Sequence, residues 1–201
     1  MRKMIWFTVV SIIVMVFAVP VILALGLTMV PLNTQPGYDP NIRVSIYRDR
    51  IFVQKFTSNT ASLTALGLSI RNPNLKNKTS IILNLQDLEG NIVRSVAISG
   101  MNLEDGSFTK FIFEPIPDSF GKEYLFTISS PGAGPEETIE VFIIDPEESS
   151  GITEYSYMGE TYSGGTPIVV YKSPENKLSV VKSIYSNWLS RLILGRSQKS
   201  L

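Results

Sequence analysis

The sequence predicts an all-β protein: an antiparallel β-sandwich preceded by one N-terminal transmembrane helix and followed by a C-terminal amphipathic helix. A long uncharged apolar run opens the chain, short runs with period-two alternation fill its middle, and an apolar stripe at helical spacing lies near its end. The expected domains are an anchor with a short cytoplasmic N-terminus, a linker, the sandwich and a basic amphipathic tail helix, over residues 1–32, 33–42, 43–171 and 172–201.

The N-terminal run carries no charged residue from Met4 to Pro31. A helix needs roughly 20 apolar residues to cross the hydrocarbon core of a bilayer, so this run can span it with some tilt. Pro20 is expected to kink the helix without ending it, as membrane helices allow. A cleaved signal peptide is the alternative, with a small-residue site at 24–26. Because the apolar run continues past that site, the uncleaved anchor is favoured.

The charge layout predicts the orientation of this anchor. Arg2 and Lys3 precede the helix, and the next basic residue is Arg43. The positive-inside rule then places the N-terminus in the cytoplasm and the rest of the chain outside, as a single-pass membrane protein. Beyond the anchor the charges are strongly segregated, with a net charge of +4 over 39–102, −11 over 103–171 and +5 over 172–201.

The middle of the chain reads as a series of short strands separated by turns. Leu66, Leu68 and Ile70 alternate with small or polar residues, which is typical of a strand with one buried face. Phe126 and Ile128 alternate in the same way, and Phe126 is expected to point inward. Proline, glycine and asparagine interrupt the runs about every ten residues, as in sandwiches and barrels. The expected strands are 44–47, 51–57, 63–71, 80–86, 92–98, 108–113, 124–129, 138–144, 155–162 and 168–171.

The order of these runs resembles a known type of domain. Gln54-Lys55-Phe56-Thr57-Ser58 is followed by Leu83-Asn84-Leu85-Gln86-Asp87 and then by the strand pair around Phe113 and Phe126. This spacing resembles jelly-roll domains of the carbohydrate-binding-module type, found on microbial envelope proteins and beside membrane glycosyltransferases. The resemblance covers about residues 50–171 and implies two packed sheets with a ligand face, but it assigns no ligand residue.

Composition excludes several chemistries. Cysteine and histidine are both absent, which removes disulfides, thiolate and imidazole metal sites, and any Ser-His or Cys-His nucleophile. An S-x-x-K spacing occurs at Ser119 with Lys122 and at Ser179 with Lys182, but the K-T-G element that accompanies a catalytic serine of this type is missing. We therefore predict that the protein is not an enzyme.

No cofactor is expected, and calcium is the one metal candidate. The acidic half offers loop carboxylates of the kind that calcium binds, without EF-hand spacing. A solvated acidic surface is the favoured interpretation. The loop carboxylates in question are Glu104, Asp105, Asp118, Asp145, Glu147 and Glu148.

A ligand platform is predicted on Tyr155, Tyr157 and Tyr162, with Tyr155 and Tyr157 on the same side of one strand. Flat rings beside polar groups can bind the C–H faces of sugars, but tyrosines are also ordinary sheet residues, so packing is the competing interpretation. Asn77-Lys78-Thr79 is an N-glycosylation sequon.

The C-terminal segment predicts an amphipathic helix, capped at Ser173 with Pro174 in its first turn. Its apolar face could cover the sandwich, lie on the membrane surface or bind another protein, and the first of these is favoured. The residues of this docking or membrane-surface face are Val180, Ile184, Tyr185, Trp188, Leu189 and Leu192.

Two functions follow from these features. The first is a non-catalytic, membrane-tethered binding or assembly module at the cell envelope, with a glycan or a membrane protein as partner. The alternative is an accessory subunit of a membrane enzyme that handles surface polysaccharide or glycosyl transfer. The lipid bilayer is a partner in both, and no nucleic acid is expected.

Overall fold

A computed structural model describes residues 2–103, 108–144, 154–174, 176, 178, 180–182 and 184–186 of the chain. The chain forms two compact units, one made of residues 1–30 and 174–201 and the other of residues 31–173. In the first unit, α1 (Arg2–Gly26) runs as one helix through Pro20. Its segment Ile5–Leu23 is long and apolar enough to cross a membrane.

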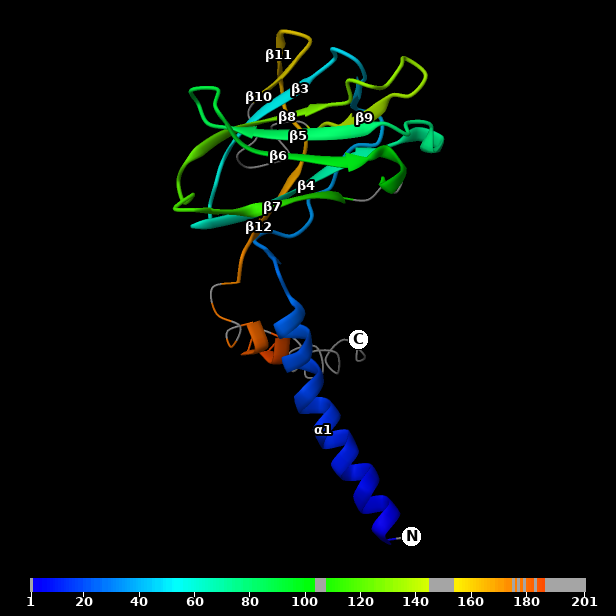
Figure 1. Cartoon of the computed structure of the whole chain (residues 1–201), viewed down its shortest axis with the longest axis vertical. Helices are drawn as coiled ribbons and strands as arrows, with labels where there is room; N and C mark the ends of the chain where they lie inside the picture. The colour runs from blue at the N-terminus through cyan, green and yellow to red at the C-terminus, as the bar shows by residue number, and fades with distance from the viewer. Residues whose placement is uncertain are drawn as a thin grey trace, which may run out of the picture. The chain divides into compact units, whose positions relative to one another are not determined.

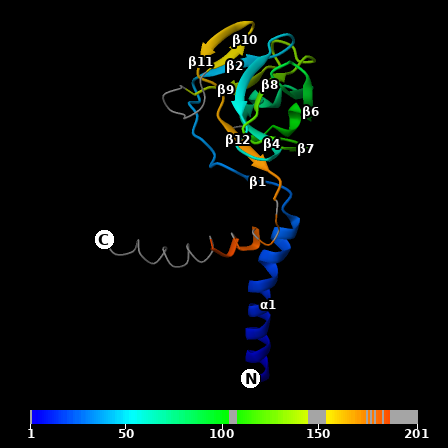
Figure 2. The same ribbon diagram turned by 90° about the vertical axis from the view of Figure 1, so that its left-hand side faces the viewer.

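The second unit is a β-domain built of two sheets, and every strand pairing with a defined register is antiparallel. Figures 1 and 2 show the two layers and, within the domain, the β10–β11 hairpin at a distance from β6 and β7. Sheet one runs β1 (Val30–Pro31), β12 (Ile168–Lys172), β4 (Ser62–Arg71), β9 (Ile139–Phe142), β2 (Arg43–Ile46), with β7 (Phe108–Pro117) also on β4. Sheet two runs β11 (Glu160–Ser163), β10 (Glu154–Tyr157), β3 (Phe52–Thr57), β8 (Glu123–Ser129), β5 (Ser80–Gln86), β6 (Ile92–Ser99).

Strand β4 organises sheet one. It pairs with β7 from Ser62 to Ser69, with β12 from Leu63 to Leu68, and with β9 at Ile70 and Arg71. Two short strands, β12 and β9, therefore follow one another along a single long partner. Two short 3₁₀ turns, η1 (Pro73–Leu75) and η2 (Gly100–Asn102), connect strands.

The core lies between the two sheets, and the predicted inward faces are confirmed. Leu66, Leu68 and Ile70 of β4 are fully buried, as are Phe126 and Ile128 of β8. Each large apolar side chain buried in this way stabilises the fold by roughly 1.5–3 kcal/mol. Period-two alternation thus identified the sides of the strands correctly, because one face of each sheet must leave water.

The outer face of β4 is buried as well, by a neighbouring aromatic ring. A Cβ at Gly67 would lie 3.1 Å from Tyr171 Cε2 and 3.3 Å from Val169 Cβ, both on β12. The Lys110 ammonium lies 5.3 Å from the centroid of the Tyr171 ring, from the β7 side. The ring therefore crosses β4 where only glycine leaves room for it.

Two predicted strands differ most from the structure. The predicted strand 155–162 is a hairpin, in which β10 and β11 meet at Met158 and Gly159, with φ of 55° and 82°. Positive φ at both central residues is what a tight hairpin turn requires, and a methionine in the first position gave no turn signal. The other strand, β7, runs four residues beyond the predicted end, to Pro117, because an edge strand tolerates proline.

The predicted linker 33–42 belongs to the β-domain. Leu32 N–H donates to the Val170 carbonyl, and the Asn33 amide bonds both the Ile168 carbonyl and the Val170 N–H, at 2.9 and 3.1 Å. The Asn33 side chain thereby substitutes for a strand residue beside β12. Further along, the Tyr38 ring stacks on Phe142 at 4.5 Å. We call residues 31–41 the strap.

The C-terminal segment is helical at Leu178, 180–182 and 184–186. Asn176 supplies the cap, since its Oδ1 accepts from Leu178 N–H at 2.8 Å. The predicted cap at Ser173 is wrong, because residues 174 and 176 are not helical, and the Ser173 N–H donates to the Ser62 carbonyl. The start of β4 provides that acceptor, which the local sequence does not reveal.

Candidate functional site

The three predicted platform tyrosines all lie on the β10–β11 hairpin. Tyr155 is only 9% exposed and stacks on Phe52 in the core, with ring centroids 5.3 Å apart. The Tyr157 hydroxyl donates to the Ser45 carbonyl at 2.6 Å, which fixes that ring against β2. Tyr162 is 40% exposed and stacks on Tyr155 at 5.3 Å. Tyr155 and Tyr157 therefore share one side and pack inward, and the Tyr162 ring is the accessible one.

Polar groups adjoin this accessible ring. The Tyr162 hydroxyl donates to Glu160 Oε2 at 2.7 Å, and this hydrogen bond raises the pKa of Tyr162 above its usual value. Desolvation in the core raises the pKa of Tyr155. A hydrogen bond with Tyr157 raises the pKa of Arg50, whose guanidinium lies 4.6 Å from the Tyr47 ring centroid. The hairpin thus offers an aromatic ring, a carboxylate and, beside Tyr157 next to its turn, the Arg50 cation.

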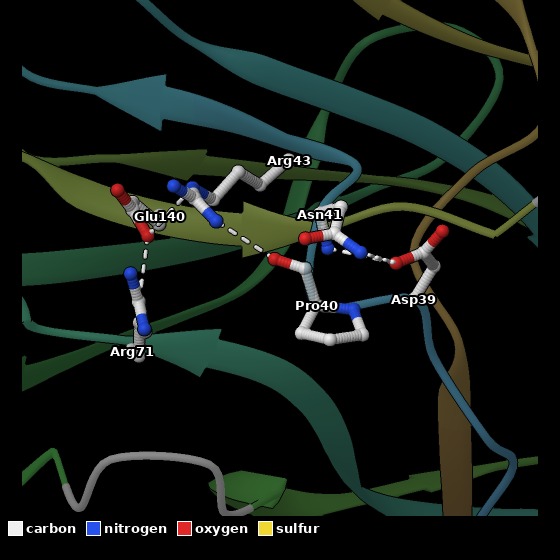
Figure 3. A network of polar contacts seen from close by, with 6 residues as sticks. All are labelled: Asp39, Pro40, Asn41, Arg43, Arg71 and Glu140. Atoms are coloured by element: carbon white, nitrogen blue, oxygen red, sulfur yellow. Dashed lines mark hydrogen bonds and ion pairs between the residues drawn. The ribbon is translucent and has the colours of Figure 1, made fainter.

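A second polar cluster lies on the outer face of sheet one (Figure 3). Arg43 and Arg71 both contact Glu140 Oε2 through Nε, at 3.1 and 2.6 Å. Arg43 also donates from Nη1 to the Pro40 carbonyl at 2.7 Å, and Asp39 Oδ1 accepts from the Asn41 backbone and amide. These bonds hold the end of the strap against β2 and β9, so the cluster is structural.

The strap also forms one wall of a shallow groove. Its residues Pro31–Gln35 face Val169 and Tyr171 of β12 across about 440 Å³. Burial raises the pKa of Tyr171. Since the Tyr171 ring is only 7% exposed, the groove presents the strap's polar side chains more than an aromatic platform.

The serine of the first S-x-x-K pattern is fully buried. Ser119 Oγ donates to the Thr60 carbonyl at 2.7 Å and accepts from Leu63 N–H at 3.1 Å. Both bonds join the turn before β8 to the start of β4. A nucleophile must reach its substrate, and this hydroxyl is committed to backbone groups. Ser179 of the second pattern lies outside the described residues.

The sequon asparagine is the centre of a buried polar network. Asn77 Nδ2 donates to the Ser130 hydroxyl at 3.0 Å and to the Glu137 carbonyl at 2.8 Å. Its Oδ1 accepts from the Thr79 N–H and hydroxyl, both at 2.8 Å. Asn77 is fully buried, so its amide nitrogen cannot carry a glycan in the folded domain.

The calcium hypothesis rests largely on residues whose placement is not described. Of the six loop carboxylates, Asp118 alone is described, and Glu104, Asp105, Asp145, Glu147 and Glu148 lie outside the described residues. Within the described part of the chain, no group of three or more acidic side chains could hold a metal ion.

The predicted docking face of the C-terminal segment is described in part. Val180, Ile184 and Tyr185 are half-buried, and Ile184 and Tyr185 lie against α1 within the first compact unit. This contact differs from the favoured seat on the sandwich. Trp188, Leu189 and Leu192 lie outside the described residues.

Comparison with known proteins adds no assignment. The chain matches no protein-family model, and a search of curated proteins finds no match.

Proposed function

We propose that the protein is a non-catalytic, membrane-tethered binding module that presents its β-domain at the outer surface of the cell envelope. The observation that carries the proposal is the short connection between the two parts. Helix α1 ends at Gly26 and β1 begins at Val30, so three residues join a membrane-length helix to a folded domain. Three extended residues span roughly 10 Å, which would hold the domain beside the bilayer.

The orientation follows from the charges at the helix ends. Arg2 and Lys3 precede α1, and the first basic residue after it is Arg43 in β2. This asymmetry supports a cytoplasmic N-terminus and an extracytoplasmic β-domain. Carbonate extraction should leave the full-length chain in the membrane, and protease added outside should digest the β-domain. If the β-domain were digested only after membrane lysis, the β-domain would lie on the cytoplasmic side, opposite to the proposed orientation.

A glycan is the ligand class that we propose, in keeping with a jelly-roll-like sandwich of the carbohydrate-binding type. The exposed Tyr162 ring can stack on the C–H face of a sugar, while Glu160 can accept hydrogen bonds from its hydroxyls. Tyr155 supports the ring from behind, which keeps it in place before a ligand arrives. The buried, backbone-bonded Ser119 supports binding without chemistry.

The experiment is a glycan-array screen of the full-length protein in nanodiscs, followed by titration of any sugar that binds. Tyr162→Ala should weaken binding by about tenfold or more, the size expected for an aromatic anchor, and Tyr162→Phe should weaken it less. Phe120→Ala is the matched control, because that ring is 71% exposed in the turn before β8. Equal losses for Tyr162→Ala and Phe120→Ala would exclude this platform.

The accessory-subunit alternative predicts a different result. A docking subunit would bind no isolated glycan and would copurify with one membrane enzyme after crosslinking in native membranes. If removal of this chain also abolished that enzyme's activity, the accessory-subunit function would be supported in place of glycan binding.

A further inference from the structure

Helix α1 contains a backbone carbonyl that lacks its usual donor within the helix. Residue 20 is proline and has no N–H, so the Val16 carbonyl lacks the donor that position i+4 normally provides. In hydrocarbon no water can replace this bond, and proline is tolerated in membrane helices where another group supplies it.

The Tyr185 hydroxyl is placed to supply the missing bond. Its oxygen lies 3.0 Å from the Val16 carbonyl and 3.1 Å from the Phe17 carbonyl, a geometry in which one proton is shared between two acceptors. The Tyr185 ring also contacts the Phe17 ring, with centroids 6.3 Å apart. Beside it, Ile184 and one face of α1 line an apolar groove of about 400 Å³.

We propose that the C-terminal segment docks on the membrane helix at Val16 and Phe17, one turn before Pro20, with Tyr185 donating the hydrogen bond that the proline removes. The inference rests on the proposed membrane anchoring. Val16 precedes Leu23, the end of the apolar span, by seven residues or about 10 Å of helix. That depth suits an amphipathic helix lying in the membrane interface, with the exposed Lys182 directed to the headgroups.

This docking gives the β-domain a second attachment. The chain enters the domain at Pro31 and leaves it after Ser173, and the two crossings are neighbours because Leu32 N–H donates to the Val170 carbonyl. We call the docked C-terminal segment the clamp, because it is a second connection of the chain between the β-domain and α1.

Disulfide crosslinking of the full-length chain in phosphatidylcholine nanodiscs tests the docked face. The protein has no cysteine, so a pair can be introduced without background. Met15→Cys with Ile184→Cys places both thiols on the groove. Val14→Cys with Ile184→Cys is the control, at the same depth on the opposite side of α1. The first pair should crosslink about tenfold faster, and equal rates would overturn the docking.

The role of Pro20 is tested by coupling two variants. Tyr185→Phe keeps the ring and removes the hydroxyl, and it should slow crosslinking of the Met15/Ile184 pair about threefold, the size of an interhelical hydrogen bond in a bilayer. With Pro20→Ala, the Val16 carbonyl regains an N–H donor, so Tyr185→Phe should then have little effect. An equal effect with and without the proline would show that the Tyr185 hydroxyl does not compensate for the N–H that Pro20 lacks, and it would overturn the proposed role of this bond.

An infrared measurement reports on the bond itself. With ¹³C=¹⁸O introduced at Val16, Tyr185→Phe should shift the labelled carbonyl to higher frequency, and the same label at Val9 should not respond. No shift at Val16 would overturn the assignment. Carbonate extraction of the same variants from the membranes of the expressing cells separates the two proposals. An extracted chain refutes the membrane anchor, whereas a retained chain without crosslinking refutes only the clamp.

Discussion

Helix α1 and strand β4 are both runs of apolar residues, yet their side chains differ in exposure to solvent. In α1 the large side chains are exposed, with Phe7 at 70% and Ile22 at 66%. In β4 the side chains of Leu63, Leu66 and Leu68 are fully buried between the sheets. Hydrophobicity alone therefore does not say what covers an apolar residue. Protein covers β4, and we propose that lipid covers α1.

The same contrast applies to polar groups. In the β-domain, the buried Asn77 uses both amide hydrogens and its oxygen within the network around Ser130 and Thr79. In α1, the Val16 carbonyl finds its donor on a distant segment of the chain, at Tyr185. With α1 in a bilayer, as we propose, both environments lack water, so each polar group needs a protein partner. The sheets provide many such partners, and a lone helix provides few.

The largest effect is expected from placing one carboxylate in each apolar run. Leu68→Asp in β4 should destabilise the β-domain by roughly 4 kcal/mol or more, because the charge is fully buried without a partner. Ile13→Asp in α1 should leave the urea midpoint of the domain unchanged and weaken membrane insertion by roughly 2.5–3.5 kcal/mol. A fall in domain stability with Ile13→Asp would show that α1 is packed in protein.

A smaller effect should follow from removing the buried amide. Asn77→Ala leaves the Glu137 carbonyl and the Thr79 N–H without their partner, which should lower the free energy of unfolding by about 2–4 kcal/mol in urea titrations. Asn91→Ala is the control, since the Asn91 side chain is exposed and its amide bonds the carboxylates of Asp87 and Glu89 within one turn. Similar midpoints for both variants would mean that the Asn77 network adds nothing to the domain.

The smallest effect locates the boundary between the two regions. Tyr38→Ala removes the strap ring that stacks on Phe142, and it should lower the stability of the domain by about 1–2 kcal/mol. Phe120→Ala, on an exposed ring, should change it by less than about 0.5 kcal/mol. If Tyr38→Ala is also neutral, the strap is a linker and the domain begins at β2.

Sequence patterns found most strands but misassigned elements that depend on distant partners. Period-two alternation placed Phe126 and Leu68 inward, because alternation is a local property of a strand. The strap reads as a linker of proline, glycine and asparagine, yet Asn33 bonds β12 more than 130 residues away. Its side chain completes the sheet edge only when the two segments meet, so no nearby pattern marks it.

The candidate site shows the same division. The sequence identified Tyr155, Tyr157 and Tyr162 as one cluster, but their exposure depends on the turn at Met158 and on the packing of Phe52 and Ser45 behind them. The sequence around Asn77 matches an N-glycosylation sequon, but the folded structure buries the Asn77 side chain completely.

The sequence by itself determined the long apolar helix, the two-faced strands and the absence of thiol and imidazole chemistry, because these depend on residue type and local spacing. The tertiary structure decided what covers each apolar face and which donor reaches each buried acceptor. The Ser119 hydroxyl donates to the Thr60 carbonyl, and the Tyr185 hydroxyl donates to the Val16 carbonyl. Both bonds join segments that meet only when the chain folds. Burial and hydrogen bonding are properties of pairs of segments, and a linear pattern describes one segment at a time.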